Sequence, residues 1–342
     1  MTNYDQLHKL DSSSTWDLTI VDEAHYIKNP ESQRSRAILR LGQRSGLVAA
    51  LTGTPVPNYL LELLPLLLLL DPKTWDMGRG SGAAFAQRYC GPKLVLRGGR
   101  YQMTYEGATN KEELQERLRS TILIRRLKSQ VLKELPAKTW KVLAFPDTGL
   151  KNLVQAEQEA FRAGGFTEDM PVEEMRKRKV PFEELSAARK ELGVAKVSAV
   201  LDHLRAVLRE QPKIAVYAHH REVLTALSNE LAEFNPAVIR GESTEEMRGN
   251  AVARFQTDPA CRVFIGSITA AGEGITLTAS SYCAFAEPSW SPKDMDQVSD
   301  RFHRIGQVNP VLIEVLVIDG SVDANVMKKV LQKVETLKGV LD

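Results

Sequence analysis

The amino-acid sequence predicts an α/β protein with parallel sheets, built as two lobes around a helical middle. Short apolar runs end in small or acidic residues, as buried parallel strands do when they deliver functional groups at their carboxyl ends; these runs lie at 18–25, 46–55, 213–220 and 262–274. Amphipathic helical patterns lie between them, at 197–210 and 221–234. Strands that alternate with helices favour a parallel sheet. With 342 residues the chain is long enough for two such cores.

The alternation stops between Leu60 and about Leu192, where the sequence is rich in leucine and then in charge. A turn-forming segment of glycine and arginine at 97–100 and a mixed-charge stretch at 175–180 interrupt this region. We interpret it as a helical insertion followed by a linker. Its most apolar part, from Leu60 to Leu70, is too short to cross a bilayer, which takes about 20 residues. It predicts a buried helix instead.

Composition limits the kinds of partner and compartment. The net charge is only +2, so any nucleic-acid contact must come from local patches rather than from a field around the whole protein.

The N-terminal sequence lacks the apolar core of a signal peptide. We expect a cytoplasmic protein, of bacterial or phage rather than nuclear origin. The cysteines lack metal-ligand spacing and predict free thiols; they are Cys90, Cys261 and Cys283.

The first motif is VDEAHYIKNP, at 21–30. Two adjacent carboxylates after a strand can hold Mg²⁺ on a nucleotide and orient the attacking water, because phosphoryl transfer depends on positioning and charge neutralisation. Asp22 would bind the metal and Glu23 would orient the water. An Asp-Glu pair alone is more often a solvated turn or a helix start. The whole DEAH string after an apolar strand favours the catalytic interpretation.

The second motif is LTGTPVPN, at 51–58. Thr52, Gly53 and Thr54 offer hydroxyls and a close backbone approach, which suit a loop that senses a phosphate. By itself this motif is better explained as a turn capped by threonines. Its position about 30 residues after DEAH makes the functional interpretation the better one.

The third motif is QVSDRFHRIGQ, at 297–307. Arg301 and Arg304 would share one face of a helix and could both reach a γ-phosphate. The planar, permanently charged guanidinium suits that task. The alternative is a solvated basic helix face, which without the other motifs would be equally good.

Together these motifs resemble the superfamily-two helicase motor, and HRIGQ resembles its Swi/Snf branch. Other segments are similar to the annealing-helicase group, with SMARCAL-like and HARP-like members. They include FAQRYCGPK, RRLKSQVLKELPAK, ELGVAKVSAVLDHL, VYAHHREVL and FAEPSWSPKDMDQ, and the likeness covers nearly the whole chain.

The resemblance implies two RecA-like lobes, the first incomplete, that grip double-stranded or branched DNA and step along it with ATP and Mg²⁺. The acidic pair and the two arginines would converge on one nucleotide. The expected division is 1–58 for the end of the first lobe, 59–145 for a helical insertion and a return to that lobe, 146–192 for a linker, 193–320 for the second lobe and 321–342 for a C-terminal helix.

The resemblance also assigns further residues. Gly272 and Gly274 would lie in a nucleotide-facing loop, and Gln307 would contact the nucleotide or the lobe interface. Phosphate-backbone contacts, which position DNA without reading its sequence, are expected from Ser267, Thr269, Thr276, Arg240 and Gly241.

The segment from Arg119 to Lys141 holds seven basic residues and one acidic residue. Arg125, Arg126 and Lys128 could therefore meet DNA phosphates. A solvated face of a connecting helix explains the same charge equally well. His219 and His220 have no Cys or carboxylate at ligand spacing in the sequence, so we expect them to be structural.

No GxxxxGK[ST] loop, which would cradle the phosphates, occurs in the sequence. We expect it upstream of residue 1 or on a separate chain that carries the missing half-lobe. The leading hypothesis is an ATPase motor chain acting as one part of such an enzyme. The alternative is a non-catalytic DNA-binding or complex-forming remnant. An RNA helicase fits the general motifs but not HRIGQ.

Overall fold

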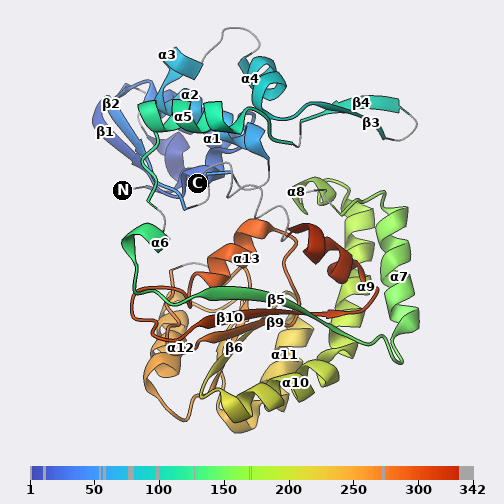
Figure 1. Cartoon of the computed structure of the whole chain (residues 1–342). Coiled ribbons are helices and arrows are strands. Elements are labelled where there is room, and N and C mark those ends of the chain that lie inside the picture. The colour runs from blue at the N-terminus through green and yellow to red at the C-terminus, as the bar shows by residue number, and fades with distance from the viewer. Residues whose placement is uncertain are drawn as a thin grey trace. The chain divides into compact units, whose positions relative to one another are not determined.

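The computed structural model describes residues 2–10, 13–53, 55–56, 59–75, 81–97, 100–105, 107–126, 128–168, 170, 172–271 and 274–330. The chain forms two compact units, divided between Arg125 and Arg126 (Figure 1). Each unit contains a parallel sheet with helices against it, so the predicted α/β class is confirmed. The described part of the chain contains no helix that is both long and apolar enough to span a membrane.

The first unit is organised around two parallel strands, β1 (Trp16–Val21) and β2 (Ser45–Ala50). Helix α1 (Gln33–Gly42) connects them, and Ser32 caps its first turn by accepting a hydrogen bond from the Ser35 amide. The remaining elements are η1 (Tyr4–Lys9), η2 (Ala24–Ile27), η3 (Leu60–Leu63), α2 (Leu64–Leu70), α3 (Pro72–Trp75), α4 (Ser81–Tyr89), β3 (Lys93–Arg97), β4 (Arg100–Thr104) and α5 (Lys111–Thr121).

The apolar stretch from Leu60 to Leu70 is helical and largely buried, as predicted. It packs in the core of the first unit with Trp75 and Phe85. One face of the β1–β2 pair contacts this core through Val21 and Val48.

The opposite face of β1 and β2 is apolar and open to solvent. Its side chains alternate along the strands with those that face the core. Leu18 lies opposite Leu47 in the register. The exposed fractions are 43% for Trp16, 51% for Leu18, 60% for Ile20 and 70% for Leu47. Parallel sheets in α/β proteins are normally covered on both faces, so this face lacks a layer among the described residues.

The second unit holds a six-stranded, all-parallel sheet with the order β5-β10-β9-β6-β8-β7. Its strands are β5 (Lys138–Phe145), β6 (Ile214–Ala218), β7 (Ala237–Ile239), β8 (Val263–Ser267), β9 (Tyr282–Phe285) and β10 (Val311–Ile318). Its helices are α6 (Lys128–Val131), α7 (Lys151–Ala163), α8 (Val172–Met175), α9 (Lys179–Ala195), α10 (Val197–Glu210), α11 (Arg221–Glu230), η4 (Ala232–Phe234), α12 (Glu245–Thr257) and α13 (Pro292–Ser299).

Strand β5 differs from the expected domain layout. Residues 59–145 were expected to form a helical insertion and then return to the first lobe, but β5 pairs with β10 along its whole length, from Lys138 to Phe145. It is therefore an edge strand of the second sheet. The expected linker at 146–192 contains α7 and α9, which run side by side in Figure 1. The expected C-terminal helix is present over 322–330, and its remainder lies outside the described residues.

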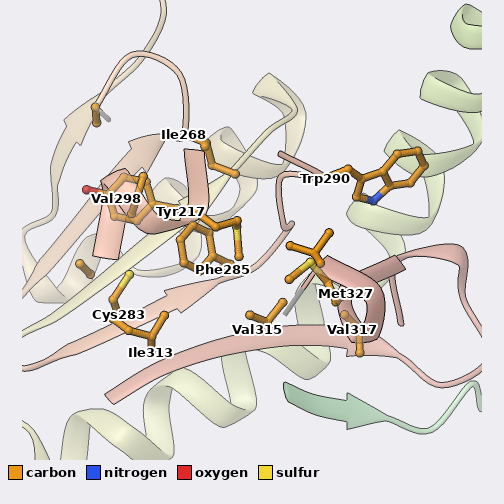
Figure 2. Packing of buried hydrophobic residues seen from close by; sticks show 14 of the residues in the cluster. Tyr217, Ile268, Cys283, Phe285, Trp290, Val298, Ile313, Val315, Val317 and Met327 are labelled. Carbon is orange, nitrogen blue, oxygen red and sulfur yellow. The ribbon is translucent and has the colours of Figure 1, made fainter. Parts of the chain in front are cut away.

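The core of the second unit is built from the large side chains of the central strands. Tyr217 of β6 and Phe285 of β9 lie side by side (Figure 2), with their ring centroids 5.9 Å apart. Phe302 meets the Tyr217 ring edge-on. Cys283 lies in the same core, and all three cysteines are free and buried. This core fixes the strand ends from which the candidate site residues emerge.

Candidate functional site

The acidic pair follows β1 at the carboxyl end of the strand. The Leu51 amide donates to the Val21 carbonyl at 2.8 Å, and the Ala24 amide donates to the Leu51 carbonyl at 2.9 Å. These bonds continue the pairing of β1 and β2 past their ends. Glu23 takes up a left-handed conformation with φ of 46°, which is uncommon for a residue with a Cβ. The chain therefore turns sharply at the pair.

His25 joins the first two motifs. Its Nδ1 lies 3.2 Å from Oε2 of Glu23 and 3.0 Å from Oγ1 of Thr52. The imidazole is 2% exposed, whereas the Glu23 side chain is 41% exposed. The buried ring can thus hold both the carboxylate and the hydroxyl while leaving Glu23 accessible. The sequence analysis assigned no role to His25, although the final position of the DEAH string was the available signal.

Asp22 is exposed and is held from two sides. Its Oδ1 accepts a hydrogen bond from the Glu23 amide at 2.9 Å, and its carbonyl accepts one from the Tyr4 hydroxyl at 2.6 Å. Burial and then the Asp22 charge raise the pKa of Tyr4 to about 12. Tyr4 therefore stays a neutral donor. The Arg34 guanidinium lies 5.5 Å from the ring centroid of Tyr4, a cation–π distance, and its charge partly offsets the rise in the Tyr4 pKa.

The rest of the second motif is only partly described. Gly53 has open space where a Cβ would stand, so its backbone is approachable. Thr54 lies outside the described residues. Asp22, Glu23, Thr52 and Gly53 thus lie around the carboxyl ends of β1 and β2.

The two arginines do not share a helix face, contrary to our prediction. Helix α13 ends at Ser299, and residues 300–306 follow turns and bends. Arg301 is 7% exposed, whereas Arg304 is half-buried. The chain leaves the turn at Gly306, whose φ of 98° favours glycine. The spacing of three residues between Arg301 and Arg304 would place them on one face of a helix. The helix ends before them, however, and the turn at 300–306 takes its place.

Arg304 is positioned by backbone and hydroxyl oxygens. Its Nε donates to the Asp300 carbonyl at 3.1 Å. Its Nη1 donates to the Ile275 carbonyl at 3.2 Å and to Oγ1 of Thr276 at 3.3 Å. Thr276, expected to contact DNA, is therefore grouped with an expected catalytic arginine.

The start of β5 and the residues just before it anchor the arginine turn. The Lys138 ammonium lies 3.0 Å from Oδ1 of Asp300 and 3.3 Å from Oδ1 of Asp296. Burial lowers the pKa of Lys138, but the two carboxylates outweigh it and hold the pKa above its ordinary value. The Nε2 of His303 donates to the Pro136 carbonyl at 2.6 Å. These contacts fix the turn from outside the motif itself.

Gln307 is buried, and its side chain is used inside the fold. Its Nε2 contacts three backbone carbonyl oxygens, and its Oε1 accepts from the amides of Val308 and Asn309, both at 3.0 Å. The carbonyls belong to Thr278, Ser280 and Phe302. This geometry gives Gln307 the role of holding the loop together.

The other expected DNA contacts lie at strand ends of the second sheet. The hydroxyls of Ser267, the last residue of β8, and Thr269 are 3.2 Å apart. Arg240 follows the neighbouring strand β7, and its amide donates to Oγ of Ser243. Nothing would obstruct a Cβ at Gly241. Strands β7 and β8 are adjacent and parallel, so these residues lie along one edge of the sheet.

Some expected site residues lie wholly or partly outside the described residues, and two neighbouring ones fall in different units. Gly274 has φ of 71°, which favours glycine, while Gly272 lies outside the described residues. Arg125 and Arg126 fall on opposite sides of the division between the units. Lys128 begins α6, but its side chain is not described.

A buried carboxylate that the sequence analysis missed holds both histidines after β6. One oxygen of Glu287, Oε2, accepts the amides of His219 at 3.0 Å and His220 at 2.8 Å; the other lies 2.7 Å from Nδ1 of His220. Burial raises the pKa of Glu287, but its contacts with His220 outweigh burial and bring it to about 2. Burial, followed by the charge of Arg189, lowers the pKa of His219 to about 4. The sequence offered no carboxylate near the two histidines, but the fold brings Glu287 against both of them.

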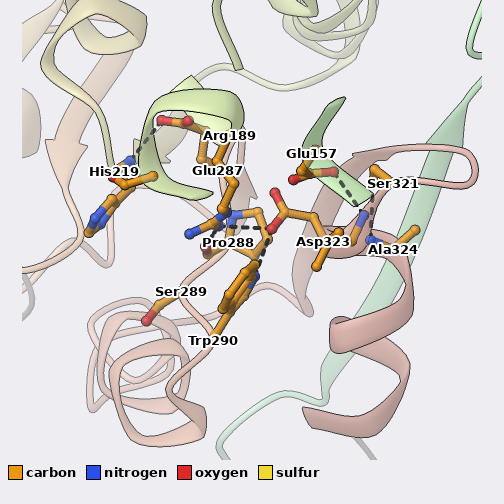
Figure 3. Close-up of polar contacts among 12 residues, drawn as sticks. Glu157, Arg189, His219, Glu287, Pro288, Ser289, Trp290, Ser321, Asp323 and Ala324 are labelled. Atoms are coloured by element: carbon orange, nitrogen blue, oxygen red, sulfur yellow. Dashed lines mark hydrogen bonds and ion pairs between the residues drawn. The ribbon is translucent and has the colours of Figure 1, made fainter. Parts of the chain in front are cut away.

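Arg189 of α9 extends this polar cluster (Figure 3). Its Nη2 donates to Oδ1 of Asp323 at 2.8 Å, and the same oxygen accepts from the Trp290 indole at 2.7 Å. The guanidinium also lies 4.0 Å from the Trp290 ring centroid. Nearby, Oε2 of Glu157 accepts the Val322 amide at 2.8 Å. The cluster fastens the inserted helices α7 and α9 to the second sheet.

Two family models match the chain. A SNF2-related domain matches residues 1–210, and a helicase conserved C-terminal domain matches residues 195–306. A solved structure titled Sulfolobus solfataricus SWI2/SNF2 ATPase core in complex with dsDNA has 23% sequence identity and a TM-score of 0.44. That match covers 99% of this chain and 72% of the solved chain.

Curated relatives match nearly the whole chain. The DNA annealing helicase and endonuclease ZRANB3 of Mus musculus is 34% identical over 90% of this chain, and the human protein is 34% identical over 91%. The SWI/SNF-related matrix-associated actin-dependent regulator of chromatin subfamily A-like protein 1 of Xenopus tropicalis is 32% identical over 98%. The chain spans 28% to 35% of the length of these relatives. Their animal sources give the expected bacterial or phage origin no support. The chain belongs to the SNF2-related family of helicase-like proteins.

Proposed function

We propose that this chain is the motor part of a DNA-dependent ATPase that couples ATP hydrolysis to movement on double-stranded DNA. The observation that carries the proposal is the arrangement of Glu23, His25 and Thr52, in which a buried imidazole joins an accessible carboxylate to a hydroxyl of the next motif. Membership of the SNF2-related family supports it. So do the names of the relatives, which describe annealing helicases.

The acidic pair supplies groups suited to a magnesium nucleotide. No cluster of three or more His, Cys, Asp or Glu side chains that could cage a metal occurs in the described part of the chain. Mg²⁺ in nucleotide sites is commonly held by one or two carboxylates together with phosphates and water, and the exposed carboxylate of Asp22 fits that mode. When bound, the ion neutralises phosphate charge. Glu23 then orients the attacking water.

Arginines and hydroxyls complete the proposed assignments. Arg301 and Arg304 neutralise charge on the γ-phosphate, with Arg304 pre-positioned by its bonds to backbone carbonyls. Ser267, Thr269 and Arg240 contact the DNA backbone, since they lie along one edge of the second sheet.

We further propose that a polypeptide with a phosphate-binding loop covers the open face of β1 and β2. The exposed side chains there, such as Leu18 and Leu47, are those that a parallel sheet normally buries. No GxxxxGK[ST] loop occurs among the 342 residues. The covering layer and the missing loop would thus come from the same source, either a separate chain or further sequence of the same protein.

Hydrolysis assays with and without that polypeptide test both proposals. The 342-residue chain alone should show negligible DNA-stimulated ATP hydrolysis. Adding a polypeptide that supplies the loop should restore hydrolysis, and double-stranded DNA should stimulate it. Glu23→Gln and Arg304→Ala should each lower the restored rate of ATP hydrolysis by about 100-fold or more. Glu31→Gln is the matched control, because Glu31 is 78% exposed and pairs with Arg36.

Three results would decide against these assignments. Rapid turnover by the chain alone would remove the need for a second polypeptide. DNA binding without hydrolysis under any condition would favour a non-catalytic module. Full activity of Glu23→Gln would overturn the assignment of the acidic pair.

A further inference from the structure

The hairpin of β3 and β4 belongs to the first unit, and one of its faces is apolar and exposed among the described residues. Leu94 pairs with Met103 in the register, and Tyr101 lies two positions before Met103 on β4, so these three residues share one face. The exposed fractions are 61% for Leu94, 72% for Tyr101 and 49% for Met103. An aromatic side chain and two aliphatic ones therefore form a continuous exposed surface.

The hairpin is a separate sheet of two strands in the described part of the chain. Such a hairpin is marginally stable in water unless its apolar face packs against something. Its exposed face therefore suits a surface that becomes covered when a ligand binds.

The base of the hairpin is firmly attached. The Gly107 amide donates to the Cys90 carbonyl at 3.0 Å, and the Thr109 amide donates to the Tyr89 carbonyl at 2.8 Å. The side-chain amide of Asn110 donates to the Arg88 carbonyl at 2.8 Å. Cys90 and Tyr89 are fully buried. The strands thus extend from a fixed base, which is the arrangement of an element that presents its surface to a ligand.

Charge indicates which ligand fits. The segment from Pro92 to Tyr105 contains Lys93, Arg97 and Arg100 and no acidic residue. A positive segment with an exposed aromatic ring complements a ligand that has both phosphates and flat π faces. Unpaired DNA offers both, whereas the bases of an intact duplex are stacked on one another and hidden from the ring.

We propose that the β3–β4 hairpin binds unpaired bases where a DNA duplex opens, with Tyr101 stacking on a base. Leu94 and Met103 lie against the neighbouring base, as apolar side chains do when they enter an opened base step. Lys93, whose side chain alternates to the other face of the hairpin, adds positive charge that attracts the phosphates. The proposal rests on the proposed DNA function and adds to it the surface, on the β3–β4 hairpin, that contacts the unpaired bases.

Binding of the 342-residue chain to two labelled DNAs tests the proposal: a blunt duplex, and the same duplex ending in two unpaired arms. The wild-type chain should prefer the fork. Tyr101→Ala should weaken fork binding about 5- to 100-fold and leave duplex binding within about twofold. Tyr101→Phe keeps the ring and should retain the preference. Val180→Ala, at a residue 64% exposed in the second unit, is the matched control and should change neither affinity.

A fluorescent base analogue at the fork gives a direct readout of stacking. The wild type and Tyr101→Phe should quench it, and Tyr101→Ala should not. If Tyr101→Ala binds and quenches like the wild type, the hairpin proposal is wrong while the proposed DNA function stands. If the wild type binds neither DNA, both are wrong. Equal wild-type binding to both DNAs also overturns the hairpin proposal alone.

Discussion

The imidazole of His25 and the hydroxyl of Thr52 lie 3.0 Å apart, although the two residues are 27 positions apart in the sequence. The contact forms because β1 and β2 are parallel neighbours, which brings the segments that follow them together. Since the same Nδ1 also reaches Glu23, a change at Thr52 can be transmitted to the carboxylate. The two motifs are therefore mechanically coupled inside one unit.

This coupling is measurable in a double-mutant cycle of His25→Ala and Thr52→Val. The two substitutions should be non-additive by about 1 kcal/mol, because either one alone already breaks the shared hydrogen bond. Hydrogen exchange of the segment 18–25 gives the local opening free energy for each variant. A matched cycle of Thr52→Val with Ser14→Ala, a polar residue outside both motifs, should be additive. If the effects in the first cycle are additive, the contact between His25 and Thr52 contributes nothing to the local opening free energy.

A second prediction concerns Lys138, whose side chain is 14% exposed. Lys138→Met leaves Asp296 and Asp300 without their shared cation at the C-terminal end of α13, where negative charge is unfavourable. The free energy of unfolding of the second unit should fall by about 1–3 kcal/mol. Denaturant unfolding measures this change.

Lys141→Met on the same strand is the control for that experiment. Lys141 is 57% exposed and pairs with Glu314 at 3.3 Å. Glu314 keeps His203 and Tyr282 as partners, so the loss should be about 0–1 kcal/mol. Equal effects of the two substitutions would contradict the anchoring role of Lys138.

The sequence predicted the parts of this protein that depend on local pattern. Apolar runs predicted β1, β2, β6 and β8 because a buried parallel strand has few polar side chains. The motif at 21–30 could be located because its acidic pair follows such a run.

Contacts between distant segments could not be predicted in this way. The partner of β5 is β10, about 170 positions away, and nothing in the local sequence at 138–145 specifies it. The turn that carries Arg301 and Arg304 depends on contacts from Gln307 and Lys138 rather than on its own periodicity. Glu287 has no local signal because its partners, His219 and His220, follow a different strand.

Glu157 gives a third prediction, on pH. Its side chain is buried, Oε1 has no hydrogen-bond partner among the described residues, and burial followed by the Asp323 charge raises its pKa to about 7. Folding therefore favours the protonated form. The contribution of protonated Glu157 to the free energy of unfolding is fully present below the unfolded pKa of about 4.5. This contribution is lost as pH rises from there through about 7. The loss is on the order of a few kcal/mol.

Glu157→Gln should remove that dependence, since a neutral amide can still accept the Val322 amide hydrogen. The variant should match the wild type near pH 4.5 and exceed it in unfolding free energy above about pH 7. The difference between the two curves is the quantity to compare, because the lowered pKa of His219 gives both proteins a stability that rises with pH from about 4 to 6.5. Parallel curves for the two proteins would contradict the assignment. The charged groups facing Glu157 are Asp323, Arg189 and Lys196.

The fourth prediction distinguishes a structural from a nucleotide-binding role for Gln307. Gln307→Ala leaves the Thr278, Ser280 and Phe302 carbonyls and the Val308 and Asn309 amides without their side-chain partner. The buried Ser280 and Phe302 carbonyls are costly to leave without partners, so the free energy of unfolding of the second unit should fall by about 2–4 kcal/mol.

Asn309→Ala is the control, because Asn309 is exposed and its contact with Gln307 uses the backbone amide. It should change stability by less than about 0.5 kcal/mol. If Gln307→Ala keeps wild-type stability but raises the KM for ATP in the restored motor, Gln307 binds the nucleotide instead. A large loss of stability, with the KM for ATP unchanged in the fraction that remains folded, would establish that Gln307 holds the arginine loop in place.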